Sequence, residues 1–416
     1  MKTLVIDRTS MNIGGIETNQ VQLMRYCIGR GYRVVWLTTE AHEKASSYKE
    51  VTDLPEVEKY YVKRTPFGPV YPSVPFKKDE NVVVLTTDLL RYCISQPAMR
   101  KWECDSLTHL LTIPHFKGGM ALPEMIFRRG KMREYWRRRL ASAVAWLVRA
   151  GALVGFDRVH LTTYEQNYGI SIHNKEAKEL KSIFPLESPS EQVIDARVAN
   201  RKKSFEIIAC SRFDFPHKGY MLGLIDAFGD ICKRHPETRL IIVGYGEGER
   251  QVKDAISRLP EAAQSRVELT GSLSPDQLKD RMQSCHLNVG MAGALWRGAE
   301  CALPSISMRH YTLQCEGYGL LDEVGDVMSE APGTDVAPLI ERVIEMDDKT
   351  YIAKCLASFK AAQARVDVDP EYVFKIPATR RGTLPMPEAC ARMVFFQRQI
   401  LEKVCKRSLF EDQQDA

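Results

Sequence analysis

The sequence has no CxxC pair and no other spacing typical of a metal site, although it contains eleven cysteines among 416 residues. An odd number of scattered cysteines also argues against a disulfide framework. We therefore predict free thiols, no bound metal ion and a reducing, cytoplasmic environment.

A long apolar run is missing as well. No stretch approaches the roughly 20 apolar residues that a membrane-spanning helix needs, and the run after Met1 is too short for a signal peptide. The net charge is only +5 and the apolar fraction, 44%, is ordinary for a globular protein. These totals predict a soluble or membrane-peripheral protein with two domains.

What the sequence does contain is a repeated alternation of short apolar runs with helix-length segments, typical of parallel sheets covered by helices. The runs are 3–7, 33–39, 81–87, 106–113 and 159–163, and then 205–212, 239–246, 267–273, 286–291 and 304–308. A polar stretch separates the two series. We predict Rossmann-like domains at 1–185 and 205–385, a linker at 186–204, and an amphipathic C-terminal helix at 386–416.

Gly14 and Gly15 stand between the first expected strand and the first expected helix. Glycines let a backbone approach an anion closely, and a helix N-terminus offers free N–H groups. The pair fits a tight turn without a ligand equally well. A GxGxxG pattern is absent here, which disfavours a nicotinamide dinucleotide.

The segment SRFDFPHKGY, residues 211–220, follows the first strand of the second series. Parallel sheets bind ligands beyond the carboxyl ends of their strands, so Arg212 and Lys218 are expected to face a crevice. An arginine fork and a lysine charge together can neutralise a diphosphate without a metal. Solvated loop charges are the alternative interpretation.

This loop resembles the donor-binding loop of family 4 (group 1) glycosyltransferases, through its pattern Arg-aromatic-Asp-any-Pro-any-Lys-Gly. It is similar above all to the loop of phosphatidylinositol mannosyltransferases and of bacterial cell-surface polysaccharide enzymes. Other segments follow in the family's order: GGIE (14–17), LTIPHF (111–116), LIIVGYGEG (240–248), VELTGSLS (267–274), GMAGALWRGAECALPSI (290–306) and a closing helix. The resemblance implies the GT-B fold, in which two Rossmann-like domains face each other across a cleft and the C-terminal helix crosses back to the N-terminal domain.

The resemblance also implies roles for the two domains. A nucleotide-sugar donor would bind the second domain, and a glycan or lipid-linked acceptor the first. Arg212 and Lys218 would stabilise the leaving diphosphate. The family retains the anomeric configuration, with the leaving phosphate helping to deprotonate the acceptor, so neither a metal, a cofactor nor the carboxylate pair of glycoside hydrolases is implied.

Several glycines are implied to contact the donor. Gly14 and Gly15 would approach its phosphates from the first domain. Gly246, Gly271 and Leu273 would frame the nucleoside.

His115 follows a strand of the first series and matches the family's histidine near the reacting sugar. A neutral histidine can position a hydroxyl group or accept a proton. A structural residue is an equal alternative, and His109, inside the strand, is expected to be one.

Residues 127–149 begin with a cluster of seven basic residues and one acid, which leads into an apolar run. Such a cluster, with Tyr135 and Trp136 between the arginines, suits an anionic membrane surface. A solvated helix face is the alternative. No nucleic acid is expected as a partner, because no recognition motif accompanies the charge. Peripheral contact with the inner face of the cell membrane is thus predicted here.

The chain departs from the family at its glutamate pair. Counting back from Pro304 places Arg297 at the second glutamate and Val289 at the first. Glu300, three residues after Arg297 on the same helix face, could replace the carboxylate that holds the ribose, or Arg297 could hold a different, acidic donor. EGYGLLDE (316–323) resembles the pair only superficially, because it has six intervening residues and leaves too little chain for the next strand.

Three functions fit these patterns. The first is an active, retaining, metal-independent glycosyltransferase of cell-surface polysaccharide biosynthesis, such as capsule or lipopolysaccharide. The second is a non-catalytic GT-B protein that scaffolds a glycan-assembly complex, suggested by the missing glutamates. The third is a GT-B nucleotide-sugar epimerase.

Overall fold

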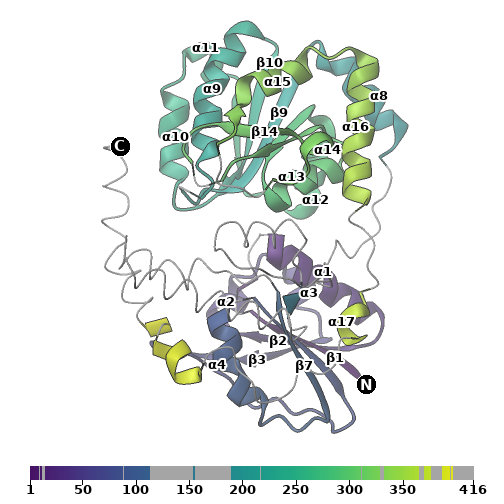
Figure 1. The fold of residues 1–416 in the computed structure, drawn as a ribbon, viewed down its shortest axis with the longest axis vertical. Helices are drawn as coiled ribbons and strands as arrows, with labels where there is room; N and C mark the ends of the chain where they lie inside the picture. The colour runs from purple at the N-terminus through teal and green to yellow at the C-terminus, as the bar shows by residue number, and fades with distance from the viewer. Residues whose placement is uncertain are drawn as a thin grey trace. The chain divides into compact units, whose positions relative to one another are not determined.

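The chain forms two compact units in a computed structural model (Figure 1). Residues 1–183 with 368–416 make the first unit, and residues 184–367 make the second. The structure describes residues 1–8, 10–11, 15–87, 89–112, 153–154, 189–215, 217–310, 312–327, 332–364, 370–375, 387–393 and 395–396. None of the helices in these ranges combines the length and apolar character needed to cross a membrane.

The first unit contains a parallel sheet with the strand order β3-β2-β1-β6-β7-β8. Its strands are β1 (Lys2–Asp7), β2 (Arg33–Thr38), β3 (Val57–Tyr61), β6 (Asn81–Thr86), β7 (Ser106–Thr112) and β8 (Leu153–Val154). The central strands are apolar on both faces because both faces are covered: Leu4 and Ile6 pack into one core cluster and Val5 into another. Its other elements are α1 (Gly15–Gly29), α2 (Glu40–Lys44), α3 (Lys49–Thr52), β4 (Lys63–Thr65), β5 (Gly68–Val70), α4 (Leu89–Met99) and α17 (Tyr372–Lys375).

The second unit contains a sheet with the strand order β11-β10-β9-β12-β13-β14-β15. The strands β9 (Phe205–Arg212), β10 (Thr238–Tyr245), β11 (Val267–Gly271), β12 (Leu287–Gly290) and β13 (Ser305–Met308) are parallel, whereas β14 (Glu316–Leu320) and β15 (Thr334–Asp335) run antiparallel at one edge. The helices are α8 (Glu191–Arg201), α9 (Tyr220–Arg234), α10 (Glu249–Ser257), α11 (Glu261–Gln264), α12 (Pro275–Ser284), α13 (Ala292–Glu300), α14 (Leu321–Val324), α15 (Val336–Ile344) and α16 (Asp348–Gln363). The predicted α/β fold with two Rossmann-like units is confirmed.

The segment expected to be a linker, 186–204, contains α8 instead. Ser190 caps this helix, because its hydroxyl accepts a hydrogen bond from the Val193 N–H. Arg197 is buried and donates hydrogen bonds to the backbone carbonyls of Gln283, Cys301 and Ala302. The helix is therefore part of the second unit. Its polar composition does not predict a packed helix, because the buried side chain that holds it in place is an arginine.

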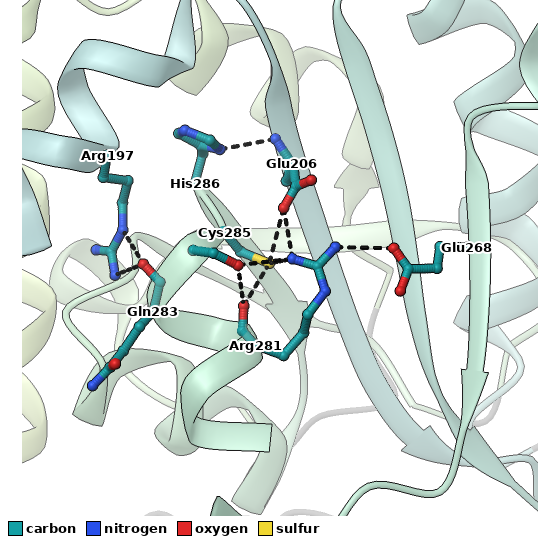
Figure 2. Close-up of polar contacts among 8 residues, drawn as sticks. Arg197, Glu206, Glu268, Arg281, Gln283, Cys285 and His286 are labelled. Atoms are coloured by element: carbon teal, nitrogen blue, oxygen red, sulfur yellow. Dashed lines mark hydrogen bonds and ion pairs between the residues drawn. The ribbon is translucent and has the colours of Figure 1, made fainter. Parts of the chain in front are cut away.

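A second polar cluster fixes the amino ends of the strands in this sheet (Figure 2). Arg281 of α12 pairs with Glu206 at 2.6 Å and Glu268 at 3.1 Å, and the Glu206 N–H donates to His286 Nδ1 at 2.9 Å. Burial lowers the pKa of His286 to about 4 and raises the pKa of the Cys285 thiol to about 12. A neutral imidazole and a protonated thiol fit a structural cluster, which lies at the edge of the sheet opposite the carboxyl ends.

The chain returns to the first unit after residue 367, earlier than the boundary at 386 that the sequence suggests. Phe374 packs edge-on against Tyr32, with ring centroids 5.4 Å apart, and Glu371 pairs with Lys2. Phe396 stacks on Phe67 at 4.6 Å. The expected return of the C-terminal segment to the N-terminal domain is thus visible in the parts of it that the structure describes.

Candidate active site

The carboxyl edge of the second sheet has a topological switch point. From β9 the sheet extends through β10 on one side and through β12 on the other, and Ile208 lies opposite both Ile241 and Asn288. Open α/β sheets bind ligands at such a point, where the connections from adjacent strands diverge. The loops after β9, β10 and β12 are therefore the ones that can form a site.

The loop after β9 is held tightly against β10. The Phe213 N–H donates to the Tyr245 carbonyl at 2.8 Å, and the Gly248 N–H donates to the Phe213 carbonyl at 3.0 Å. Within the loop, the Lys218 N–H donates to the Asp214 carbonyl at 2.9 Å. This fixed loop carries Arg212 and Lys218 at the sheet edge, as the sequence predicts.

The two cations differ in their surroundings. Arg212 is exposed at the end of β9, and among the residues that the structure describes it forms no ion pair. Lys218 is half-buried one residue before Gly219, the N-cap of α9. Asp214 lies between them in the sequence and pairs with His217, whose Nδ1 is 3.8 Å from the Asp214 Oδ2. This contact, assisted by the charges of Arg212 and Lys218, lowers the pKa of the Asp214 carboxyl group. A diphosphate at this edge would find an exposed guanidinium and a nearby ammonium.

Two glycines at the end of β10 and just after it explain how the loop comes so close. Gly246 has φ +147°, and a Cβ there would lie 2.8 Å from the Phe213 carbonyl oxygen. A Cβ on Gly244 would lie 2.0 Å from the Ser211 carbonyl oxygen. In the structure the absence of a side chain at Gly246 thus lets the loop with Arg212 and Lys218, here called the cationic loop, pack against it. The predicted contact of Gly246 with a nucleoside stays a prediction.

The other residues predicted to frame the nucleoside, Gly271 and Leu273, lie at the end of β11 and just after it. Gly271 has φ +73°, a conformation that favours glycine, and nothing lies within 4 Å of a Cβ built there. Leu273 packs partly buried against a cluster that includes Ile241 and Val243. The conformation of Gly271 therefore shapes the loop, while Leu273 anchors it.

Helix α13, which follows β12 at the carboxyl edge of the sheet, carries Arg297. Arg297 pairs with Glu300 at 2.6 Å on one face of the helix. Burial raises the pKa of the Cys210 thiol, on β9, to about 11, while the charges of Lys218 and Arg297 act in the opposite direction. The positive charges of Lys218 and Arg297 thus both lower the pKa of the same thiol, although the two residues belong to different elements.

The start of α13 accounts for the missing glutamate. Val289 is fully buried in β12, so the position counted as the first glutamate lies in the core. Only Met291 separates β12 from α13, and Ala292 begins the helix with φ +49°, a left-handed conformation that is costly for alanine. The buried amide of Asn288 supports this tight connection by donating to the carbonyls of Ala294 and Leu295. The loop that would carry a carboxylate is absent between these two elements.

The glutamates of EGYGLLDE are engaged elsewhere. Glu316 lies in β14 and pairs with Arg309 at 2.6 Å. Glu323 lies in α14 and pairs with Arg342 and Lys354, both at 2.7 Å. Both carboxylates neutralise structural cations, so this segment does not supply the missing pair.

Some predicted residues lie outside the described residues: Gly14, His115 and the basic segment 127–149. Gly15 is the first residue of α1. His109 is fully buried in β7, between Thr86 and Gln96, and burial lowers its pKa to about 3. The interpretation of His109 as a structural residue is confirmed.

A polar network that the sequence does not predict lies at the switch point of the first sheet, between β1 and β6. Asp7 ends β1, is fully buried, and accepts hydrogen bonds from Tyr71 at 3.0 Å and Thr86 at 2.9 Å, with Arg91 at 3.4 Å. Arg8 donates to Thr87 at 2.8 Å and pairs with Glu17 of α1. The available signal was the charged pair Asp7-Arg8 directly after a buried strand.

The described residues contain no group of three or more His, Cys, Asp or Glu placed to hold a metal ion. The described cysteines are all free thiols, as predicted.

Comparisons with known proteins agree with this architecture. Residues 191–290 match the family model described as "Glycosyl transferases group 1". No curated protein matches the chain. The part of the chain that the family model covers runs from α8 to the end of β12, and so includes the cationic loop.

Solved structures resemble nearly the whole chain at low identity. The structure of Anabaena Alr3699/HepE in complex with UDP and glucose has a TM-score of 0.52 and 17% identity, covering 90% of this chain and 97% of that one. A point mutant of Staphylococcus aureus TarM, in complex with fondaparinux, alpha-GlcNAc-glycerol and UDP, has a TM-score of 0.55 and 8% identity, covering 90% and 98%. The trehalose-6-phosphate protein from E. coli, bound with UDP-2-fluoro glucose, has a TM-score of 0.52 and 10% identity, covering 90% and 97%. These likenesses show the GT-B fold.

Proposed function

We propose that this chain is a retaining glycosyltransferase that needs no metal ion. It moves a sugar from a nucleotide-sugar donor to a glycan or lipid-linked acceptor in cell-surface polysaccharide biosynthesis, in the cytoplasm at the inner face of the membrane. The observation that carries the proposal is the pair Arg212 and Lys218, fixed at the switch point of a sheet whose sequence matches group 1 glycosyl transferases.

The proposed transfer depends on stabilising the negative charge of the leaving diphosphate. Cleavage of the bond between sugar and diphosphate leaves negative charge on the β-phosphate, and fixed cations lower the barrier by stabilising that charge. Arg212 can bind two phosphate oxygens at once, and Lys218 adds a second positive charge. In the proposed route the leaving phosphate, rather than a carboxylate, accepts the proton of the acceptor hydroxyl.

The experiment is a transfer assay with a panel of UDP-sugars, chosen because the structural neighbours hold UDP. Product analysis by NMR is expected to show retained anomeric configuration, with turnover unchanged by EDTA. Arg212→Ala and Lys218→Ala should each lower kcat/KM by about two orders of magnitude or more. Unchanged turnover in both variants would reject this mechanism.

A non-catalytic scaffold is the second candidate, because Val289 and Arg297 stand where the family has carboxylates. A scaffold would show neither transfer nor donor hydrolysis with any sugar of the panel. Interconversion of donor epimers without an acceptor would instead identify an epimerase.

A further inference from the structure

An exposed hairpin projects from the first unit. The strands β4 and β5 pair antiparallel, with Lys63 opposite Val70, and Phe67 lies in the turn between them. Phe67 is 50% exposed and Val70 is 46% exposed. Two large apolar side chains thus remain in water on a short two-stranded element.

The C-terminal segment extends this surface. Phe396 stacks on Phe67, and Arg392 donates hydrogen bonds to the carbonyls of Phe67 and Pro69. Met393, one helical turn before Phe396, is 60% exposed. Figure 1 shows this segment, in yellow, beside α4. The hairpin is therefore seated on the C-terminal segment, while Phe67, Val70 and Met393 each remain about half exposed among the described residues.

The chain segment that contains the hairpin carries charge of one sign. Residues 59–78 contain five basic residues and no acid: Lys59, Lys63, Arg64, Lys77 and Lys78. Lys63 and Arg64 are exposed beside the apolar side chains. Glu43 pairs with Lys59, and Glu388 pairs with Arg392. Exposed apolar side chains beside Lys63 and Arg64, which form no ion pair with another described residue, match an anionic lipid surface, with apolar groups entering the headgroup region and cations facing phosphates.

We infer that the face made by Lys63, Arg64, Phe67, Val70 and Met393, here called the hairpin face, binds an anionic membrane surface. The inference deepens the proposed function, on which it rests for the lipid-linked acceptor. It places membrane contact on a different segment from the basic cluster at 127–149.

The position of the hairpin connects the proposed membrane contact with the carboxyl edge of the first sheet. The Val62 N–H, just before β4, donates to the Thr38 carbonyl at the carboxyl end of β2. Tyr71, just after β5, donates to Asp7 at the carboxyl end of β1. The hairpin therefore starts and ends at the carboxyl edge of the first sheet, where its switch point lies. A bilayer on the hairpin face would present a lipid-linked acceptor beside that edge.

The test is sedimentation of the full-length protein with vesicles of phosphatidylglycerol and phosphatidylcholine in equal parts, compared with phosphatidylcholine alone. We expect binding to the anionic vesicles that weakens in high salt. Lys63→Gln with Arg64→Gln should lower the partition coefficient about 30-fold, since each basic side chain at an anionic surface contributes about fivefold. Val70→Ser should lower it further without touching the Phe67 stack.

Matched controls come from the second unit. Leu356→Ser removes an apolar side chain that is 50% exposed, and Arg250→Gln removes a side chain that is 92% exposed. Neither should change binding, and thermal melting shows whether each variant is folded. Unchanged partition of the hairpin variants, or no binding by the wild type, would overturn the inference.

Donor hydrolysis in solution separates this inference from the proposed function. Hairpin variants that lose vesicle binding should keep wild-type hydrolysis of the donor. Vesicle binding through the hairpin face together with no turnover on any donor would instead reject the proposed function alone.

Discussion

At the scale of single residues, Arg297 and Glu300 neutralise each other on α13, but they differ in exposure. The Arg297 side chain is 36% exposed and that of Glu300 is 16% exposed. The arginine is therefore the member able to meet a ligand, and its charge acts on β9 together with that of Lys218. We predict that Arg297→Ala weakens UDP binding about tenfold or more, the effect of one charged hydrogen bond, whereas Glu300→Gln weakens it less.

Calorimetric titration of UDP into both variants measures this difference. A larger loss in Glu300→Gln would assign the binding role to the carboxylate. Equal affinity of both variants and the wild type would place the pair outside the donor site.

His109 makes the first unit sensitive to acid. Its pKa is about 3 in the folded protein, because it is fully buried, and about 6.5 in the unfolded chain. Between these values the unfolded state binds the extra proton, so stability rises with pH and is lost as pH falls below about 6.5. At pH 5 the loss is about 2 kcal/mol relative to pH 7.

His109→Gln should reduce that loss, since glutamine stays neutral between Thr86 and Gln96. Urea unfolding of the wild type and the variant at pH 7 and pH 5 measures the change in each. The same decrease in both proteins would contradict this account of His109.

Individual side chains of the candidate site could be predicted to different degrees. The positions of Arg212 and Lys218 could be predicted because the two residues come at the end of a buried strand and just after it. The structure places both at the carboxyl end of that strand. The ion pair of Arg297 with Glu300 follows from helical spacing, but which of them is exposed depends on packing. Asp7 was missed because its partners, Tyr71, Thr86 and Arg91, are far away in sequence.

At the scale of elements, α8 contains two buried arginines, Arg197 and Arg201, and Arg197 is the one that joins it to two other segments. Arg197 is 2% exposed and satisfies three carbonyl groups on two other segments. Arg197→Ala leaves these carbonyls buried without donors, so we predict a loss of about 3 kcal/mol in the free energy of unfolding of the second unit. Urea denaturation followed by tryptophan fluorescence measures it.

Lys202, at the end of the same helix, provides the control. Its side chain is 74% exposed, so Lys202→Ala should change stability by less than about 0.5 kcal/mol. Similar effects of the two substitutions would mean that α8 does not anchor the unit.

The parallel strands were predictable because strands buried on both faces read as continuous apolar runs. The strand β14 was not, because EGYGL contains two glycines and a glutamate, and its place at the sheet edge comes from pairing with β13. The helix α8 was hidden for a similar reason, since hydrophobic periodicity does not reveal a buried arginine.

At the scale of the whole molecule, the chain builds one unit, then the second, and returns to the first. The return is fixed by the contact between Tyr32 and Phe374, and by Arg392 and Phe396 on the hairpin. The fold class could be predicted from the alternation of strands and helices. The residue at which the chain returns to the first unit could not, because nothing in the sequence around Phe374 predicts its contact with Tyr32. For the second unit we propose that Arg212 and Lys218 bind the diphosphate of a nucleotide sugar.

Comparison of UDP with uridine tests that claim most directly, by isothermal titration of the wild type, Arg212→Ala and Lys218→Ala. Only UDP carries the phosphates, so each substitution should weaken UDP binding about tenfold or more and leave uridine binding unchanged. Equal losses for both ligands, or none for either, would contradict the account.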